Sequence, residues 1–97
     1  MVLSGGSYTR SKEDSEKNSF YNLQNLGTMT INSGVSVTAD GHYSSLVANG
    51  WYNGSQNTAK QEANLTITGG NFSGGLNTIK NDDWGVLEIS GGNFSNT

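Results

Sequence analysis

The sequence predicts an all-β fold, a short right-handed parallel β-helix (a solenoid) of about four coils of ~22 residues with two loop insertions. One observation is a nine-residue string that recurs at a fixed spacing. A second is the composition: Gly, Asn, Ser and Thr make up about half of the 97 residues, proline is absent, and only 13% of residues are charged. A third is that the two longer spacings between copies contain polar segments, which are typical of loops.

The best copies of the repeat are residues 65–73 (LTITGGNFS) and 87–95 (LEISGGNFS), 22 residues apart. Residues 2–9 (VLSGGSYT) form a third copy and residues 29–37 (MTINSGVSV) a looser fourth. In each copy a short alternating strand points one aliphatic side chain inward. A pair that contains glycine then turns the chain, and a second apolar side chain points inward.

Equivalent side chains of successive coils are expected to stack along the solenoid, at the spacing of neighbouring strands. The copies therefore predict one aliphatic and one aromatic column, in which the looser copy contributes valine to the second. The predicted members are Leu3, Ile31, Ile67 and Ile89 in the first column, and Tyr8, Phe72 and Phe94 with Val35 or Val37 in the second.

A weaker repeat consists of residues 20–25, 45–49 and 77–81, each of which reads as a strand that ends in asparagine. Two or three short strands per coil are therefore expected. The asparagines, Asn25, Asn49 and Asn81, predict a ladder of side-chain amides that hydrogen-bond along the stack.

The spacing of the inward aliphatic residue grows to 28 and then 36 residues between the earlier copies. The additional residues fall in two polar segments without a core pattern, about 9–19 and about 52–62. We interpret both as loops that project from a single domain spanning residues 1–97.

The rival fold is a small antiparallel sandwich or meander, because Asn49-Gly50 and Asn53-Gly54 are favourable hairpin turns. A hairpin fold gives no reason for the same string to return after 22 residues. The repeat therefore favours the β-helix.

The strings LTITGGNFSG and LEISGGNFSN resemble the T-I-x-G-G-x-F-S coils of β-helical surface proteins and phage structural proteins of Gram-positive gut bacteria. The resemblance covers most of the chain and implies a solenoid architecture. It implies no catalytic residue, because such proteins are defined by their coils.

The residue types give no basis for catalysis or metal binding. The chain has no cysteine, and His42 is its only histidine. The adjacent carboxylates Asp82 and Asp83 lack the further ligands that Ca²⁺ needs, and a solvated turn is the simpler interpretation. We expect no enzyme activity, no catalytic residue, no cofactor and no metal site.

Charge and hydropathy limit the partners. A net charge of −3 gives no basic surface for nucleic acid. No apolar stretch is long enough to span a membrane, and no signal peptide is recognised at Met1. The location is not predicted: a cell surface or virion fits part of a longer protein, and a host cytoplasm fits a phage inhibitor.

The best candidate for a partner-binding surface is aromatic. Trp51 and Trp84 follow equivalent asparagines and are expected to be neighbours on one edge of the solenoid. The alternative interpretation is that both are packed corner residues without a binding role. Tryptophan and tyrosine dominate protein-binding hot spots. The candidate partner-binding residues are Trp51, Tyr52, Trp84, Tyr43, Asp82 and Asp83.

The predicted function is a non-enzymatic protein-binding or structural β-helix module of phage or bacterial-surface type. The alternative is a phage or mobile-element inhibitor of a host defence nuclease (anti-CRISPR-like) that acts by steric occlusion. A polysaccharide-processing enzyme is less favoured, because no acid–base pair can be placed. A protein partner is expected, and uncapped coil ends predict association into homo-oligomers.

Overall fold

The computed structural model describes residues 1–10, 20–40 and 44–96, which form eleven strands and one short 3-10 helix. The strands are β1 (Val2–Leu3), β2 (Gly6–Arg10), β3 (Phe20–Asn25), β4 (Thr28–Ile31), β5 (Val35–Ala39), β6 (Ser44–Asn49), β7 (Ala63–Ile67), β8 (Asn71–Gly74), β9 (Asn77–Asn81), β10 (Gly85–Ile89) and β11 (Asn93–Ser95). The 3-10 helix, η1, spans Gly54–Gln56.

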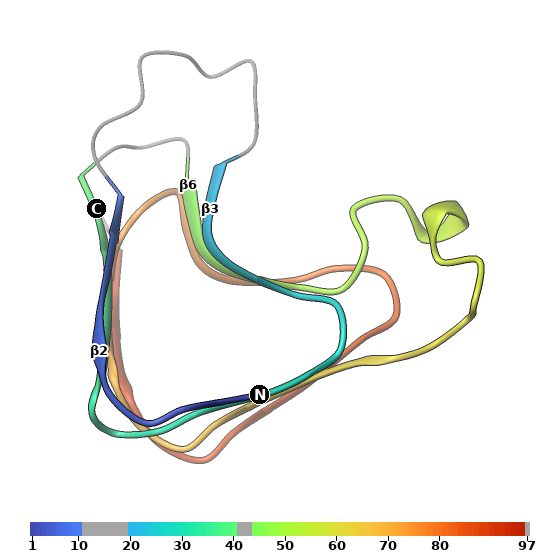
Figure 1. Ribbon diagram of the computed structural model, residues 1–97. Coiled ribbons are helices and arrows are strands. Elements are labelled where there is room, and N and C mark those ends of the chain that lie inside the picture. The colour runs from blue at the N-terminus through green and yellow to red at the C-terminus, as the bar shows by residue number, and fades with distance from the viewer. Residues whose placement is uncertain (11–19, 41–43, 97) are drawn as a thin grey trace.

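The strands form three sheets, and every pairing between them is parallel. Sheet A has the order β1-β4-β7-β10, sheet B the order β2-β5-β8-β11, and sheet C the order β3-β6-β9. The chain passes through the sheets in the cycle A, B, C, and one such passage is called a coil below (Figure 1). The chain is therefore all-β with parallel sheets, as predicted and as a β-solenoid requires, and the antiparallel rival is wrong.

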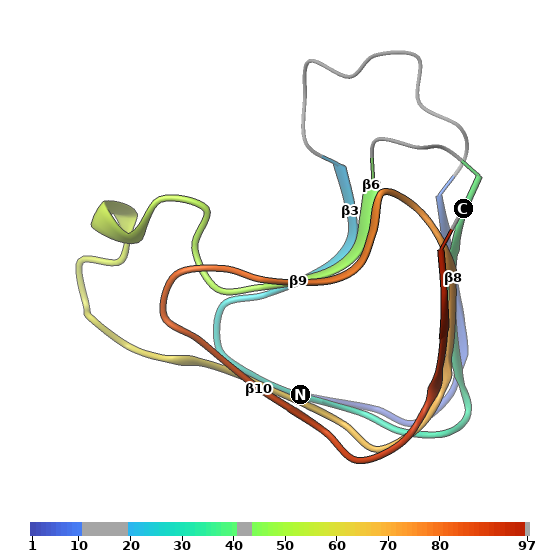
Figure 2. The same ribbon diagram turned by 180° about the vertical axis from the view of Figure 1, so that it is seen from behind.

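The sheets are the walls of a flat molecule. Seen from the front and from behind, equivalent strands of successive coils lie over one another along each wall (Figures 1 and 2). The principal extents are 34 × 32 × 17 Å. The shortest extent fits about four layers of strands at a spacing of about 4.8 Å.

The strand register confirms both predicted columns. Leu3 pairs with Ile31, Ile31 with Ile67, and Ile67 with Ile89. In sheet B the register aligns Tyr8, Val37, Phe72 and Phe94 in that order. The rings of Phe72 and Phe94 stack with centroids 4.9 Å apart and planes 8° from parallel.

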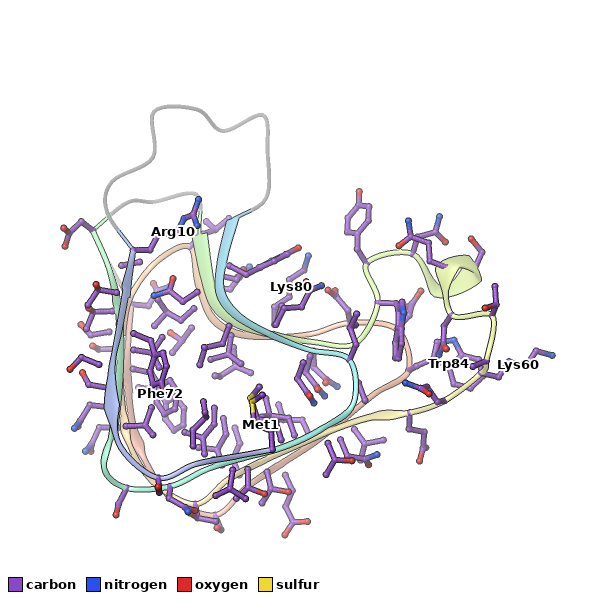
Figure 3. All side chains as sticks on the ribbon, in the orientation of Figure 1. Met1, Arg10, Lys60, Phe72, Lys80 and Trp84 are labelled. Atoms are coloured by element: carbon purple, nitrogen blue, oxygen red, sulfur yellow. The ribbon has the colours of Figure 1, made fainter. Side chains whose placement is uncertain are left out.

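Apolar side chains fill the space between the three walls, with Phe72 among them (Figure 3). The fully buried ones belong mostly to the second and third coils, because only these coils have a neighbour on each side. In the last coil Ile89 keeps its column position but is 46% exposed. The buried core consists of Met29, Ile31, Val35, Val37, Ala39, Leu46, Val47, Leu65, Ile67 and Phe72.

The predicted asparagine ladder is also confirmed. The Asn25 side-chain amide donates to the Asn49 side-chain oxygen at 2.8 Å, and the Asn49 amide donates to the Asn81 oxygen at 2.9 Å. Asn49 is fully buried and also donates to the carbonyl oxygens of Ala63 and Val86. The ladder therefore satisfies buried polar groups where sheet C meets sheet A.

The two predicted loops differ in what the structure shows. The first was expected from about residue 9, but Thr9 and Arg10 belong to β2, because they pair with Thr38 and Ala39. Residues 11–19 lie outside the described residues. Residues 50–62 connect β6 to β7 and project away from the walls (Figure 1).

Replacing Gly74 by alanine is expected to lower the free energy of unfolding by at least about 2 kcal/mol. Gly74 has a φ of 99°, and a Cβ there would lie 2.2 Å from the carbonyl oxygen of Ala39. Gly27→Ala is the matched control, since a Cβ at Gly27 meets nothing within 4 Å. Urea denaturation of both variants measures the difference, and equal midpoints would contradict the packing described here.

Asn49→Ala is expected to reduce the free energy of unfolding by about 3 kcal/mol, because the Asn25 amide and the carbonyl oxygen of Ala63 each lose a hydrogen-bond partner at a buried position. Asn77→Ala is the control. Asn77 is exposed and makes a single long bond, 3.3 Å, to the Ser45 hydroxyl. Thermal and urea unfolding followed by circular dichroism will distinguish the two, and a mild effect at Asn49 would mean that the ladder contributes little.

Candidate functional site

Three turns connect sheet C to sheet A at one corner of the molecule: residues 26–27, 50–62 and 82–84. Large apolar side chains are exposed on all three turns, namely those of Leu26, Tyr52 and Trp84. Tyr52 is 75% exposed and Trp84 is 43% exposed. The other exposed large apolar residues among those described are Leu76 and, in the first and last coils, Met1, Val2, Val86, Ile89 and Phe94.

The structure brings five of the six predicted partner-binding residues together at this corner. We call Trp51, Tyr52, Asp82, Asp83 and Trp84 the corner surface. The sixth, Tyr43, lies outside the described residues. The corner surface therefore combines two turns that are about 30 residues apart in the sequence.

Backbone hydrogen bonds join these two turns. The Trp51 amide donates to the Asp83 carbonyl oxygen at 2.9 Å, and the Asp83 amide donates to the Trp51 carbonyl at 3.2 Å. Trp51 therefore pairs with Asp83 and not with Trp84, so the equivalence that the sequence predicted for the two tryptophans is displaced by one residue. The reason is a difference in turn length, since one residue separates Asn49 from Trp51 and two separate Asn81 from Trp84.

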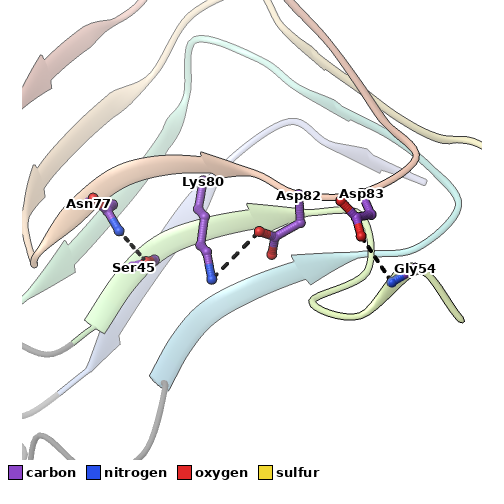
Figure 4. A network of polar contacts seen from close by, with 6 residues as sticks. All are labelled: Ser45, Gly54, Asn77, Lys80, Asp82 and Asp83. Carbon is purple, nitrogen blue, oxygen red and sulfur yellow. Dashed lines mark hydrogen bonds and ion pairs between the residues drawn. The ribbon is translucent and has the colours of Figure 1, made fainter. Parts of the chain in front are cut away.

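Both carboxylates of the corner surface have partners within the chain. Asp83 accepts a hydrogen bond from the Gly54 amide at 3.0 Å, which attaches the 3-10 helix to the turn of residues 82–84 (Figure 4). The Asp82 oxygen lies 3.6 Å from the Lys80 ammonium nitrogen. No group of three or more histidine, cysteine, aspartate or glutamate residues that could hold a metal ion occurs in the described part of the chain.

Lys80 is a member of the site that the sequence did not reveal. Its ammonium nitrogen lies 5.7 Å from the ring centroid of Tyr21 and 5.3 Å from that of Tyr52, on the outer side of sheet C (Figure 3). Such distances give a favourable cation–π interaction with each ring. Lys80 therefore links the exposed tyrosine of the loop to the wall.

Trp84 has a left-handed backbone conformation, with φ of 65°. The Gly85 amide donates to the Asp82 carbonyl at 3.0 Å, so residues 82–85 form a tight turn with Trp84 at its third position. Glycine or asparagine is favoured there, and another residue raises the energy by about 1–2 kcal/mol. In Figure 3, Trp84 lies at the same corner of the molecule as the loop of residues 50–62.

Strained backbone of this kind persists where the surrounding structure holds it, and it is concentrated at functional sites. A half-exposed tryptophan in that conformation is therefore a stronger sign of function than exposure alone.

No family model, no curated protein and no solved structure matches the chain. Within the described residues, none of the helical structure has the length and apolar character needed to cross a bilayer.

Lys80→Met is expected to lower the free energy of unfolding by about 1 kcal/mol, because the apolar stem is kept while the ion pair and both cation–π contacts are lost. Lys60→Met is the control, since Lys60 is exposed on the loop and has no ion pair or cation–π contact with any described residue. Chemical denaturation measures the change in the free energy of unfolding for both variants. A negligible change in both would show that the two ring contacts do not contribute to stability.

Proposed function

We propose that the three sheets are the sides of a short right-handed parallel β-helix of about four coils, and that this helix is a non-enzymatic module whose corner surface binds a protein partner. The cyclic strand order and the pairing of Ile67 with Ile89, 22 residues further on, support the β-helix. The resemblance of the repeat to β-helical surface and phage proteins supports the same architecture and a binding or structural role.

The observation that carries the functional proposal is the exposure of Tyr52 and Trp84 on neighbouring turns of one corner. Exposed aromatic side chains provide large contact areas with little loss of side-chain entropy on binding. Leu26 is exposed on the third turn of the same corner. Away from this corner and from the first and last coils, the only other large apolar side chain exposed in the described residues is Leu76, which is isolated between β8 and β9.

The corner surface is also held in place before a partner binds. The backbone pairs between Trp51 and Asp83, the bond from the Gly54 amide to Asp83, and the Lys80 contact with Tyr52 all fix the loop on the wall. A pre-ordered surface loses less conformational entropy on association. Because Asp82 and Asp83 already bond within the chain, we assign them to shaping the surface and not to acid–base chemistry.

The test uses a photocrosslinking amino acid placed at position 52 in one variant and at position 76 in another, each expressed in the native host or its infected cells. Leu76 is a matched control, because it is 61% exposed but lies at a different corner. We expect a defined protein adduct from position 52 only. Trp84→Ala in the first variant should reduce the adduct by at least about tenfold, a loss of about 1.4 kcal/mol of binding.

Equal adducts from both positions, or an adduct unaffected by Trp84→Ala, would exclude the corner as the binding surface. Adducts only to glycans would replace the protein partner with a polysaccharide. An adduct to a host nuclease would instead identify the protein as an inhibitor.

A further inference from the structure

The chain contains two Asn-Gly pairs in its described turns, and they have opposite environments. Asn49-Gly50 ends β6, where the Asn49 side chain is fully buried in the ladder. Asn53-Gly54 lies on the projecting loop, where Asn53 is exposed. Asparagine before glycine is chemically labile, because glycine has no side chain to hinder its amide nitrogen and leaves the backbone free to rotate.

We propose that Asn53 is a site of spontaneous deamidation, and that the Asp83 carboxylate controls its rate. In this reaction the backbone nitrogen of Gly54 forms a bond to Cγ of Asn53, and the bond from Cγ to the side-chain nitrogen breaks. Ammonia leaves, and the proton of the attacking nitrogen passes through solvent. Water then opens the resulting succinimide ring at either carbonyl, which leaves aspartate or isoaspartate at position 53.

The hydrogen bonds of the loop oppose ring closure. The Gly54 amide, which must attack, donates to Asp83 Oδ2 at 3.0 Å. The Asn53 side-chain oxygen accepts from both the amide and the hydroxyl of Ser55, at 3.1 and 2.8 Å. Asn53 has an extended ψ of 110°, which turns the Gly54 nitrogen away from its Cγ.

Rotation of the peptide into the reactive arrangement therefore requires the bond between Gly54 and Asp83 to break. This bond has a charged acceptor and is correspondingly strong. Asp83 thus acts as a positioning residue, which lowers the population of the reactive conformation without taking part in the chemistry.

Deamidation would change the corner surface. It places a second carboxylate on the residue next to the Gly54–Asp83 bond, and like charges at such short range repel each other. Isoaspartate also lengthens the main chain by one carbon between Tyr52 and Gly54. The loop that carries Tyr52 would then separate from the turn of residues 82–84. The inference does not rest on the proposed partner, because the reaction occurs within this chain.

The experiment follows deamidation of the folded protein at mildly alkaline pH by peptide mapping, with aspartate and isoaspartate products separated by chromatography. We expect Asp83→Ala to react about tenfold faster at Asn53 than wild type, which corresponds to about 1.4 kcal/mol. Asp83→Asn, whose side-chain oxygen can still accept from Gly54, should react at an intermediate rate. Asp82→Ala is the matched control and should react as wild type does, because Asp82 contacts Lys80 and not the loop amide.

Asn49 serves as an internal monitor of folding, because it should remain intact in every folded variant and react only in denaturant. Comparable modification of Asn49 and Asn53 in native wild type would overturn the proposal. So would equal Asn53 rates in wild type and a folded Asp83→Ala protein, or acceleration by Asp82→Ala as large as that by Asp83→Ala.

Discussion

Parallel pairing that places equivalent residues of successive coils over one another is the constraint on which the rest of this structure depends. Because each strand pairs with the strand one coil away, its inward side chain meets a side chain at the same position of the repeat. Ile31 and Ile67 can therefore pack in one column, and Asn49 can bond to an asparagine on each side. A side chain in the second or third coil has such a neighbour on each side, which is why these two coils contain the buried core.

The same constraint does not fix the length or the sequence of the turns at the corners. A turn between two walls contributes no side chain to a column, so its length can vary while the register of the walls is kept. Two residues connect β3 to β4, whereas residues 50–62 connect β6 to β7, and both connections return the chain to sheet A in register. The corner between sheets C and A is therefore where the chain can acquire features that the repeat does not require.

This division explains what could be predicted from the sequence. The columns and the ladder were predictable, because they follow directly from the period of the repeat. The pairing of Trp51 with Asp83 was not, since turns of unequal length have no common register. The contact of Lys80 with two tyrosine rings was also not predictable, because it depends on how far a flexible side chain reaches across a bent sheet. The left-handed backbone of Trp84 could not be predicted either, because a tryptophan gives no sequence signal for a conformation that glycine or asparagine usually adopts.

The corner surface consequently has to be treated as one unit. Its aromatic residues come from two turns that belong to different coils, and Asp83 joins those turns through both its backbone and its side chain. Residues that share such a connection do not contribute independently, because removing one changes the position of the others. A substitution at Asp83 therefore affects the setting of Trp51 and of the loop as well as the turn that carries Trp84. The partner binding that we propose for this corner should therefore depend on the Asp83 connection as strongly as on any single aromatic residue.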